Sequence, residues 1–151
     1  MELNQKQTDL DLWLIRIWLK ANRAINDQIV NDIKRHGLSV ENFMILELLF
    51  NKGPQTIQTI SERLAIPSGS ITYVVNRLAS KNYVRRETCK NDRRSSYVVL
   101  TETGQQMFQQ IFPEHVKLLI ELVEPLSKDE KETLAHLLKK LGRHAEQLEI
   151  D

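Results

Sequence analysis

The spacing of hydrophobic residues predicts a chain built mostly of helices. Between residues 9 and 35 there is no proline or glycine, and apolar residues recur every three or four positions, as they do along one face of a helix. Trp13 and Ile17 widen the apolar stripe that Leu14 and Trp18 begin. A stripe this wide indicates a helix that is covered on more than one side.

Capping residues mark the next helix. Gly37 is expected to end the first helix in the left-handed conformation, and Ser39 is expected to cap a second helix over residues 40–51. The stretch NKGPQ, residues 51–55, then interrupts the helical pattern, because it brings glycine and proline together.

Two short helices joined by a tight turn follow. Thr56 is placed to cap the first, and Ser68 is placed to cap the second, which is expected over residues 69–81. The apolar positions of the second helix are Ile71, Val74, Val75 and Leu78. Its other faces carry Ser70, Thr72, Tyr73, Asn76 and Arg77. This arrangement is the helix-turn-helix pattern.

A β-hairpin is predicted directly after these helices. Asn82 tolerates the positive φ that ends a helix. The segments YVRRET, residues 83–88, and SYVVLT, residues 96–101, have the composition of strands and are joined by the polar loop CKNDRR. A hairpin in this position makes a winged helix, and residues 83–101 form its wing.

The rest of the chain is predicted to be helical. Thr101 is expected to cap a helix that runs to residue 123, with Pro113 kinking it or breaking it in two. Ser127 and Glu130 have the spacing of a capping box, which predicts a last helix to about residue 148. Its apolar residues alternate in threes and fours, as in a helix-packing seam: Leu134, Leu138, Leu141, Ala145 and Leu148.

Composition narrows the class of protein. The chain has 151 residues, of which 41% are hydrophobic and 27% charged, which is typical of a soluble domain large enough to bury a core. No apolar run is long enough to span a membrane, and the first residues lack the features of a signal peptide, so we expect a cytoplasmic protein. A single cysteine excludes an internal disulfide framework. We expect neither a metal nor a cofactor.

The net charge of +1 hides a local imbalance. Residues 68–94 contain seven cationic and two anionic side chains, whereas residues 121–151 contain five cationic and eight anionic ones. A basic segment within a nearly neutral chain indicates a surface that meets an anion.

The order of these elements and the residues within them resemble the MarR family of bacterial transcriptional regulators over nearly the whole chain. The most specific match is in the wing, where Asp92, Arg93, Arg94 and Ser95 lead into Leu100, Thr101 and Gly104. The segment TISERLAIPSGSITYVVNRLASKNYVRR matches the helix-turn-helix. Asn76 stands where the family commonly has an acidic residue, so an ion pair between this position and a wing arginine is not carried over. Asn82 stands where the family usually has glycine.

The resemblance implies a homodimer with interleaved first and last helices, which places two winged helices in adjacent major grooves of a pseudo-palindromic operator. Residues 1–36 and 103–151 would then form the dimerisation region, and residues 37–102 the DNA-binding domain. It also implies repression of nearby genes, relieved by a small phenolic or lipophilic compound or by cysteine oxidation.

The candidate DNA-binding residues lie in the helix at 69–81 and in the wing. Side chains near the start of a helix reach base edges or phosphates in the major groove, where Arg77 suits guanine and Asn76 suits adenine. Asp92 is expected to hold Arg94, because strand residues two apart project to one side, while Arg94 enters a narrow minor groove. The full set is Ser68, Ser70, Thr72, Tyr73, Asn76, Arg77, Lys90, Asp92, Arg93 and Arg94. The alternatives are that Ser68 is only a cap, that Arg77 is a solvated helix charge and that the wing tip is a solvated basic loop.

Two further features concern regulation. The candidate lining of an effector pocket between the dimer helices and the DNA-binding lobe is Trp13, Trp18, His36, Phe43 and Phe50. Aromatic residues at helical spacing are more often core, and His36 alternatively meets a helix dipole. Cys89 lies near Lys90 and Arg86, which favour a thiolate, but oxidant-sensing members of the family typically use a cysteine near the N-terminus. We therefore interpret Cys89 as incidental.

Other functions fit the sequence less well. There is no Gly-rich phosphate loop, no metal-ligand cluster and no G-x-S-x-G motif, so we do not expect an enzyme. The alternative is a winged-helix module that binds only protein, since a fold does not fix a function. The basic segment favours DNA over this alternative. RNA is disfavoured because a helix does not read its deep, narrow major groove.

Overall fold

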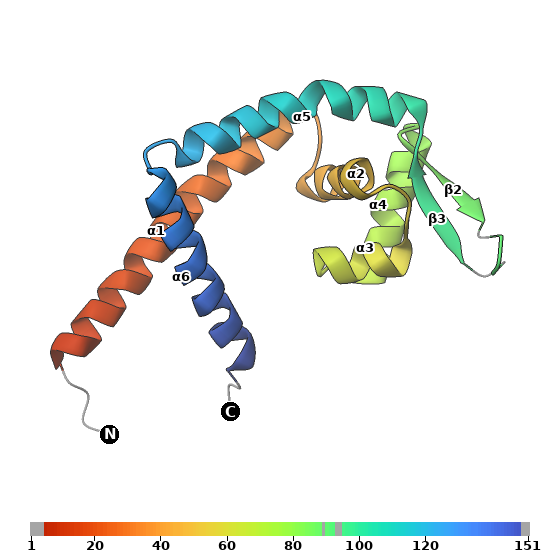
Figure 1. The fold of residues 1–151 in the computed structure, drawn as a ribbon. Helices are drawn as coiled ribbons and strands as arrows, with labels where there is room; N and C mark the ends of the chain where they lie inside the picture. Colours follow the sequence, from red (N-terminus) through yellow and green to blue (C-terminus); the bar gives the residue numbers. More distant parts are fainter. Residues whose placement is uncertain (1–4, 89, 93–94, 149–151) are drawn as a thin grey trace. The chain divides into compact units, whose positions relative to one another are not determined.

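The computed structural model describes residues 5–88, 90–92 and 95–148 (Figure 1). In chain order the elements are α1 (Gln5–Arg35), α2 (Val40–Lys52), β1 (Gln55–Thr56), α3 (Ile57–Leu64), α4 (Ser68–Ser80), β2 (Val84–Thr88), β3 (Ser96–Leu100), α5 (Glu102–Val123) and α6 (Lys128–Gln147). Residues 1–115 and residues 116–151 group into two compact units. The predicted fold class, mostly helical with a small β-hairpin wing, is confirmed. The functional division at residues 36 and 102 stays a prediction.

Most helix starts are capped as predicted. The end of α1 is also as predicted, since Gly37 follows it in the left-handed conformation with a φ of 76°. Ser39 Oγ accepts a hydrogen bond of 3.1 Å from the amide of Asn42 at the start of α2, and Thr56 Oγ1 accepts one of 3.1 Å from Thr59 at the start of α3. Each bond satisfies an amide that has no partner within its own helix.

The predicted cap at Ser68 is wrong. Ser68 is the first residue of α4, and Pro67 occupies the cap position with a φ of −53° and no side-chain cap bond. Proline has its φ fixed near the helical value and no side-chain acceptor, so it starts the helix one residue earlier than predicted. The turn before it is held by Ser61, whose Oγ donates a 2.6 Å hydrogen bond to the carbonyl of Ile66.

The hairpin is part of a three-stranded antiparallel sheet in the order β1-β3-β2. In the wing, Val84 pairs with Leu100 and Thr88 with Ser96, as the two predicted strand segments require. The strand β1 was not predicted. It has two residues, which pair with Val98 and Tyr97, and a strand this short has no alternating pattern to detect.

One hydrophobic core anchors the helix-turn-helix and the wing. Its buried side chains are Ile33, Leu38, Phe43, Ile45, Leu46, Leu49, Ile60, Ile71, Val75, Leu78, Val84, Val98 and Phe108. The predicted apolar face of α4 is confirmed, with Val74 partly buried at its edge. Because this face is fixed in the core, the opposite side of α4 is held toward solvent.

The base of the wing is closed by one side chain. Thr101 Oγ1 donates a 2.6 Å hydrogen bond to the carbonyl of Asn82 and accepts one of 2.9 Å from the amide of Gly104, which confirms Thr101 as the cap of α5. Asn82 has the expected positive φ, 61°. A Cβ at Gly104 would overlap the carbonyl oxygen of Tyr83, so only glycine fits there without moving the main chain.

The last two helices match the prediction closely. α5 continues through Pro113, so the proline does not break it in two. Ser127 and Glu130 form the predicted capping box at the start of α6. No helix in the described part of the chain is long and apolar enough to cross a membrane.

Candidate nucleic-acid interface

The outward side of α4 is polar and exposed. Its exposed residues include Ser68, Ser70, Tyr73, Asn76 and Arg77. Tyr73 is 63% exposed although its neighbours Ile71 and Val75 are completely buried. Thr72 is half-buried, and its hydroxyl donates a 2.9 Å bond to the carbonyl of Ser68. Five of the six predicted α4 residues therefore lie on the solvent side, and Thr72 lies at its edge.

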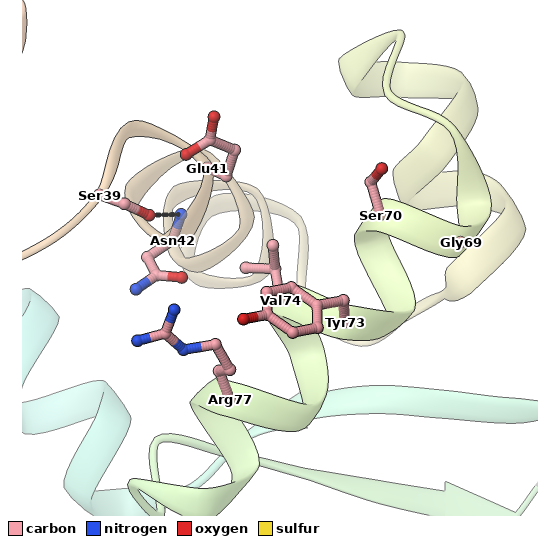
Figure 2. A pocket seen from close by; sticks show the side chains of 8 residues that line it. All are labelled: Ser39, Glu41, Asn42, Gly69, Ser70, Tyr73, Val74 and Arg77. Carbon is pink, nitrogen blue, oxygen red and sulfur yellow. Dashed lines mark hydrogen bonds between the residues drawn. The ribbon is translucent and has the colours of Figure 1, made fainter.

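An open hollow of about 510 Å³ separates this face from the start of α2 (Figure 2). It is lined by Ser39, Glu41, Asn42, Gly69, Ser70, Tyr73, Val74 and Arg77. The Arg77 guanidinium lies 5.9 Å from the centre of the Tyr73 ring, and Figure 2 shows it pointing toward the side chain of Asn42. The hollow therefore combines the Arg77 cation and the N-terminal turn of α2, which attract an anion, with the carboxylate of Glu41, which opposes one.

The tip of the wing is described only in part. Asp92 interacts with Ser95, whose Oγ donates a 3.1 Å bond to Asp92 Oδ2 and whose amide donates a 3.2 Å bond to the Asp92 carbonyl. Lys90 is exposed. Cys89, Arg93 and Arg94 lie outside the described residues, so the expected support of Arg94 by Asp92 and the interpretation of Cys89 stay predictions.

The strand β2 carries two arginines with different partners, and the sequence did not predict either partner. Arg85 forms a salt bridge of 2.6 Å with Glu87. Arg86 reaches α4, where its Nη2 donates a 2.9 Å hydrogen bond to Asn76 Oδ1. The alternation of side chains along a strand could have indicated this difference from the sequence, because residues 84, 86 and 88 share one side of the strand and residues 85 and 87 share the other.

The candidate effector residues occupy different surroundings. Phe43 is buried and Phe50 is half-buried, and the ring centre of each lies 5.2 Å from that of Phe108. Trp13 and Trp18, on α1, are 58% and 40% exposed. The structure thus brings the two phenylalanines together in the core, whereas the tryptophans lie on an exposed surface.

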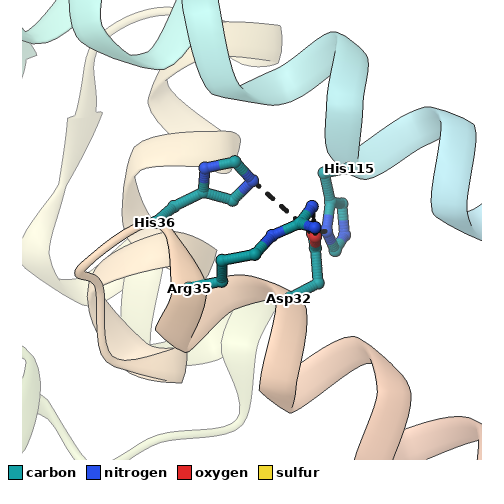
Figure 3. Close-up of polar contacts among 4 residues, drawn as sticks. All are labelled: Asp32, Arg35, His36 and His115. Atoms are coloured by element: carbon teal, nitrogen blue, oxygen red, sulfur yellow. Dashed lines mark hydrogen bonds and ion pairs between the residues drawn. The ribbon is translucent and has the colours of Figure 1, made fainter.

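The fifth candidate, His36, belongs to a polar cluster that the sequence did not reveal (Figure 3). Asp32 and His115 are 4% and 5% exposed, and their Oδ2 and Nδ1 atoms lie 2.8 Å apart. Arg35 donates a 2.7 Å bond to Asp32 Oδ1, and His36 Nε2 lies 3.7 Å from the same oxygen. The cluster joins the end of α1 to α5 through one buried carboxylate. Among the described residues, no group of three or more His, Cys, Asp and Glu side chains could hold a metal ion.

Comparison with known proteins agrees with this geometry. The sequence profile of the MarR family matches residues 38–96. The HTH-type transcriptional regulator MhqR of Bacillus subtilis (strain 168) is 38% identical over 140 residues, which cover 93% of this chain and 97% of MhqR. The chain belongs to the MarR family. The same organism's uncharacterized HTH-type transcriptional regulator YkoM is 34% identical over 148 residues, covering 98% of this MarR-family chain and 96% of YkoM. These relatives are transcriptional regulators and not enzymes.

Solved MarR-family structures share the fold. AbsC, a MarR family transcriptional regulator from Streptomyces coelicolor, has a TM-score of 0.82 and 24% identity, and the match covers 98% of this chain and 99% of AbsC. The C80S mutant of MarR from E. coli, complexed with operator DNA, has a TM-score of 0.73 and 28% identity, over 85% of this chain and 92% of that one. The family profile begins before α2 and ends at the first residue of β3, so it spans the helix-turn-helix and the wing tip.

Proposed function

We propose that this protein is a sequence-specific double-stranded DNA-binding repressor that acts as a homodimer in the bacterial cytoplasm. The observation that carries the proposal is the exposed polar face of α4 beside a basic hairpin. A helix with short polar side chains near its start fits the major groove. The operator complex of E. coli MarR supports the same use of the fold.

The proposed contacts divide into two groups. Ser70, Tyr73 and Arg77 would face the major groove, since they are exposed on α4, while Ser68 would contact a phosphate. Thr72 donates its hydroxyl hydrogen to the carbonyl of Ser68 and would lie at the edge of the interface. Lys90, Arg93 and Arg94 would reach the backbone or the minor groove from the wing, with Asp92 holding Arg94. Contacts to base edges specify the sequence, whereas contacts to the DNA backbone mainly supply affinity.

DNA binding itself is tested with fluorescence anisotropy on two labelled duplexes, one from the DNA that flanks the gene and one with the same bases scrambled. We expect the flanking duplex to bind at least about a thousandfold more tightly. On both duplexes the affinity should fall as salt rises, because bound cations release counterions from DNA. A winged helix that binds only protein would bind neither duplex at any salt concentration.

The proposed homodimer rests on apolar side chains that remain exposed. On α1 these are Leu10, Leu12, Trp13, Leu14, Ile15, Ile17, Trp18, Leu19 and Ile25. On α6, Leu134, Leu137 and Leu141 are also exposed. Large apolar side chains exposed in such number on one helix indicate an interface, and a second copy of the chain is the partner that the family resemblance implies.

Light scattering tests the assembly. We expect a mass of twice 17.6 kDa at micromolar concentration. Trp18→Glu should shift the mass toward the monomer, because an unpaired carboxylate is costly to bury. A wild-type mass of one chain would contradict the dimer and the paired half-site geometry with it.

We further propose that a small phenolic or lipophilic effector releases the protein from DNA. Trp13, Trp18, His36, Phe43 and Phe50 stay its candidate contacts. Such a ligand weakens DNA binding only if it binds the arrangement that does not fit DNA more tightly than the one that does.

A further inference from the structure

Asn76 and Arg86 form a bridge between α4 and the wing. They are ten residues apart in the chain, and both are exposed. Arg86 Nη2 donates a 2.9 Å hydrogen bond to Asn76 Oδ1. An asparagine that reads adenine uses its oxygen and its nitrogen together. Arg86 already bonds to that oxygen, so the orientation of the Asn76 amide is set by Arg86 and not by a base.

The neighbouring arginine shows what is particular about Arg86. Arg85 donates two bonds, of 3.0 and 2.6 Å, to one carboxylate oxygen of Glu87, so its charge is balanced on its own strand. Arg86 bonds to a neutral amide, and no ion pair formed among the described residues involves it. The strand β2 therefore presents one guanidinium balanced by a carboxylate and one without an ion pair among the described residues, on opposite sides of the strand.

A neutral anchor orients a cation without cancelling it. A guanidinium has five N–H donors, and the bond to Asn76 engages only one of its nitrogens. The planar fork of arginine matches the oxygens of a phosphate. Holding the side chain in place also reduces the entropy that it loses on binding.

We infer that Arg86 binds a phosphate of the DNA backbone and that Asn76 is its positioning residue. The inference rests on the proposed DNA binding and adds to it a contact outside the predicted set. Asn76 would then orient a cation and would not read a base. The replacement of the family's acidic residue by asparagine at position 76 would leave the charge of Arg86 unbalanced. An acidic residue at that position would hold Arg86 equally well but would balance its charge.

Two substitutions test the inference, with anisotropy on the flanking and scrambled duplexes across a salt series. Arg86→Ala should lower the affinity for both duplexes by the same factor. It should also reduce the slope of log affinity against log salt by about 0.9 per subunit. Asn76→Asp should reduce affinity and slope in the same direction, although it keeps an acceptor for Arg86. A bridge that is purely structural predicts the opposite for Asn76→Asp, because an ion pair would hold the wing at least as firmly.

Arg85→Ala is the matched control, because it changes the net charge by the same amount one residue away and on the other side of the strand. Its slope should stay close to that of the wild type. Thermal melts of all variants establish whether they are folded. If Arg86→Ala is unfolded, the salt slope of Asn76→Asp alone tests the inference. Wild-type slopes for both Arg86→Ala and Asn76→Asp would overturn the inference while leaving DNA binding in place. If the wild type binds neither duplex, the proposed function fails instead.

Discussion

Replacement of Asp32 with alanine should lower the free energy of unfolding by about 1–3 kcal/mol, the range for leaving a buried polar group without its hydrogen-bond partner. The Asp32 carboxylate is 4% exposed and faces His115, which is 5% exposed. Its removal leaves the His115 ring without this partner and beside Phe43, whose ring centre is 4.5 Å away. Urea denaturation at a fixed protein concentration measures the loss as a lower midpoint.

Arg35→Ala is the control for this prediction. Arg35 bonds to the same carboxylate, but its side chain is 67% exposed, so its removal should cost less than about 1 kcal/mol. Equal losses in the two variants would mean that the carboxylate is stabilised mainly from the solvent side. The buried contact between Asp32 and His115 would then contribute little.

Arg77→Ala should weaken binding to the cognate duplex by roughly 1–3 kcal/mol per half-site and change binding to scrambled DNA much less. Arg77 is exposed and lies over the ring of Tyr73, on the side of α4 away from the core. A guanidinium held there can donate two bonds to one guanine. Anisotropy on the flanking and scrambled duplexes measures both effects.

Lys81→Ala provides the comparison, because Lys81 is an exposed cation at the C-terminal end of the same helix. Lys81 is the residue that ends the helix, one turn beyond Arg77, where a cation reaches phosphates and not base edges, so its loss should affect the two duplexes alike. If Arg77→Ala also weakens both duplexes by one factor, Arg77 contacts a phosphate and not a base.

The sequence predicted the features that depend on near neighbours in the chain. Ser39, Thr56, Thr101 and the Ser127–Glu130 pair each act within three residues, so their types and spacing were enough to place the helix starts. The apolar face of α4 followed from periodicity for the same reason. The prediction that Ser68 caps α4 was wrong because Pro67 occupies the cap position. A Pro-Ser pair is compatible with either residue as the cap, so the sequence alone did not distinguish them.

The features that the sequence missed depend on long-range pairing. The bond between Asp32 and His115 spans 83 residues, and β1 is recognisable only by its partners in β3. Asn76 and Arg86 were both visible, but their bond depends on the angle between a helix and a strand. No local pattern encodes that angle, because the packing of Val75, Leu78 and Val84 in the core sets it.

Thr101 gives the wing a fixed frame at its base, since its hydroxyl bonds on one side to Asn82 and on the other to Gly104. None of these atoms belongs to the loop between the strands, so the frame does not depend on which residues the loop contains. Lengthening such a loop adds only a small entropic cost. The length and sequence of the loop can therefore change without disturbing the hydrogen bonds that hold the base of the wing.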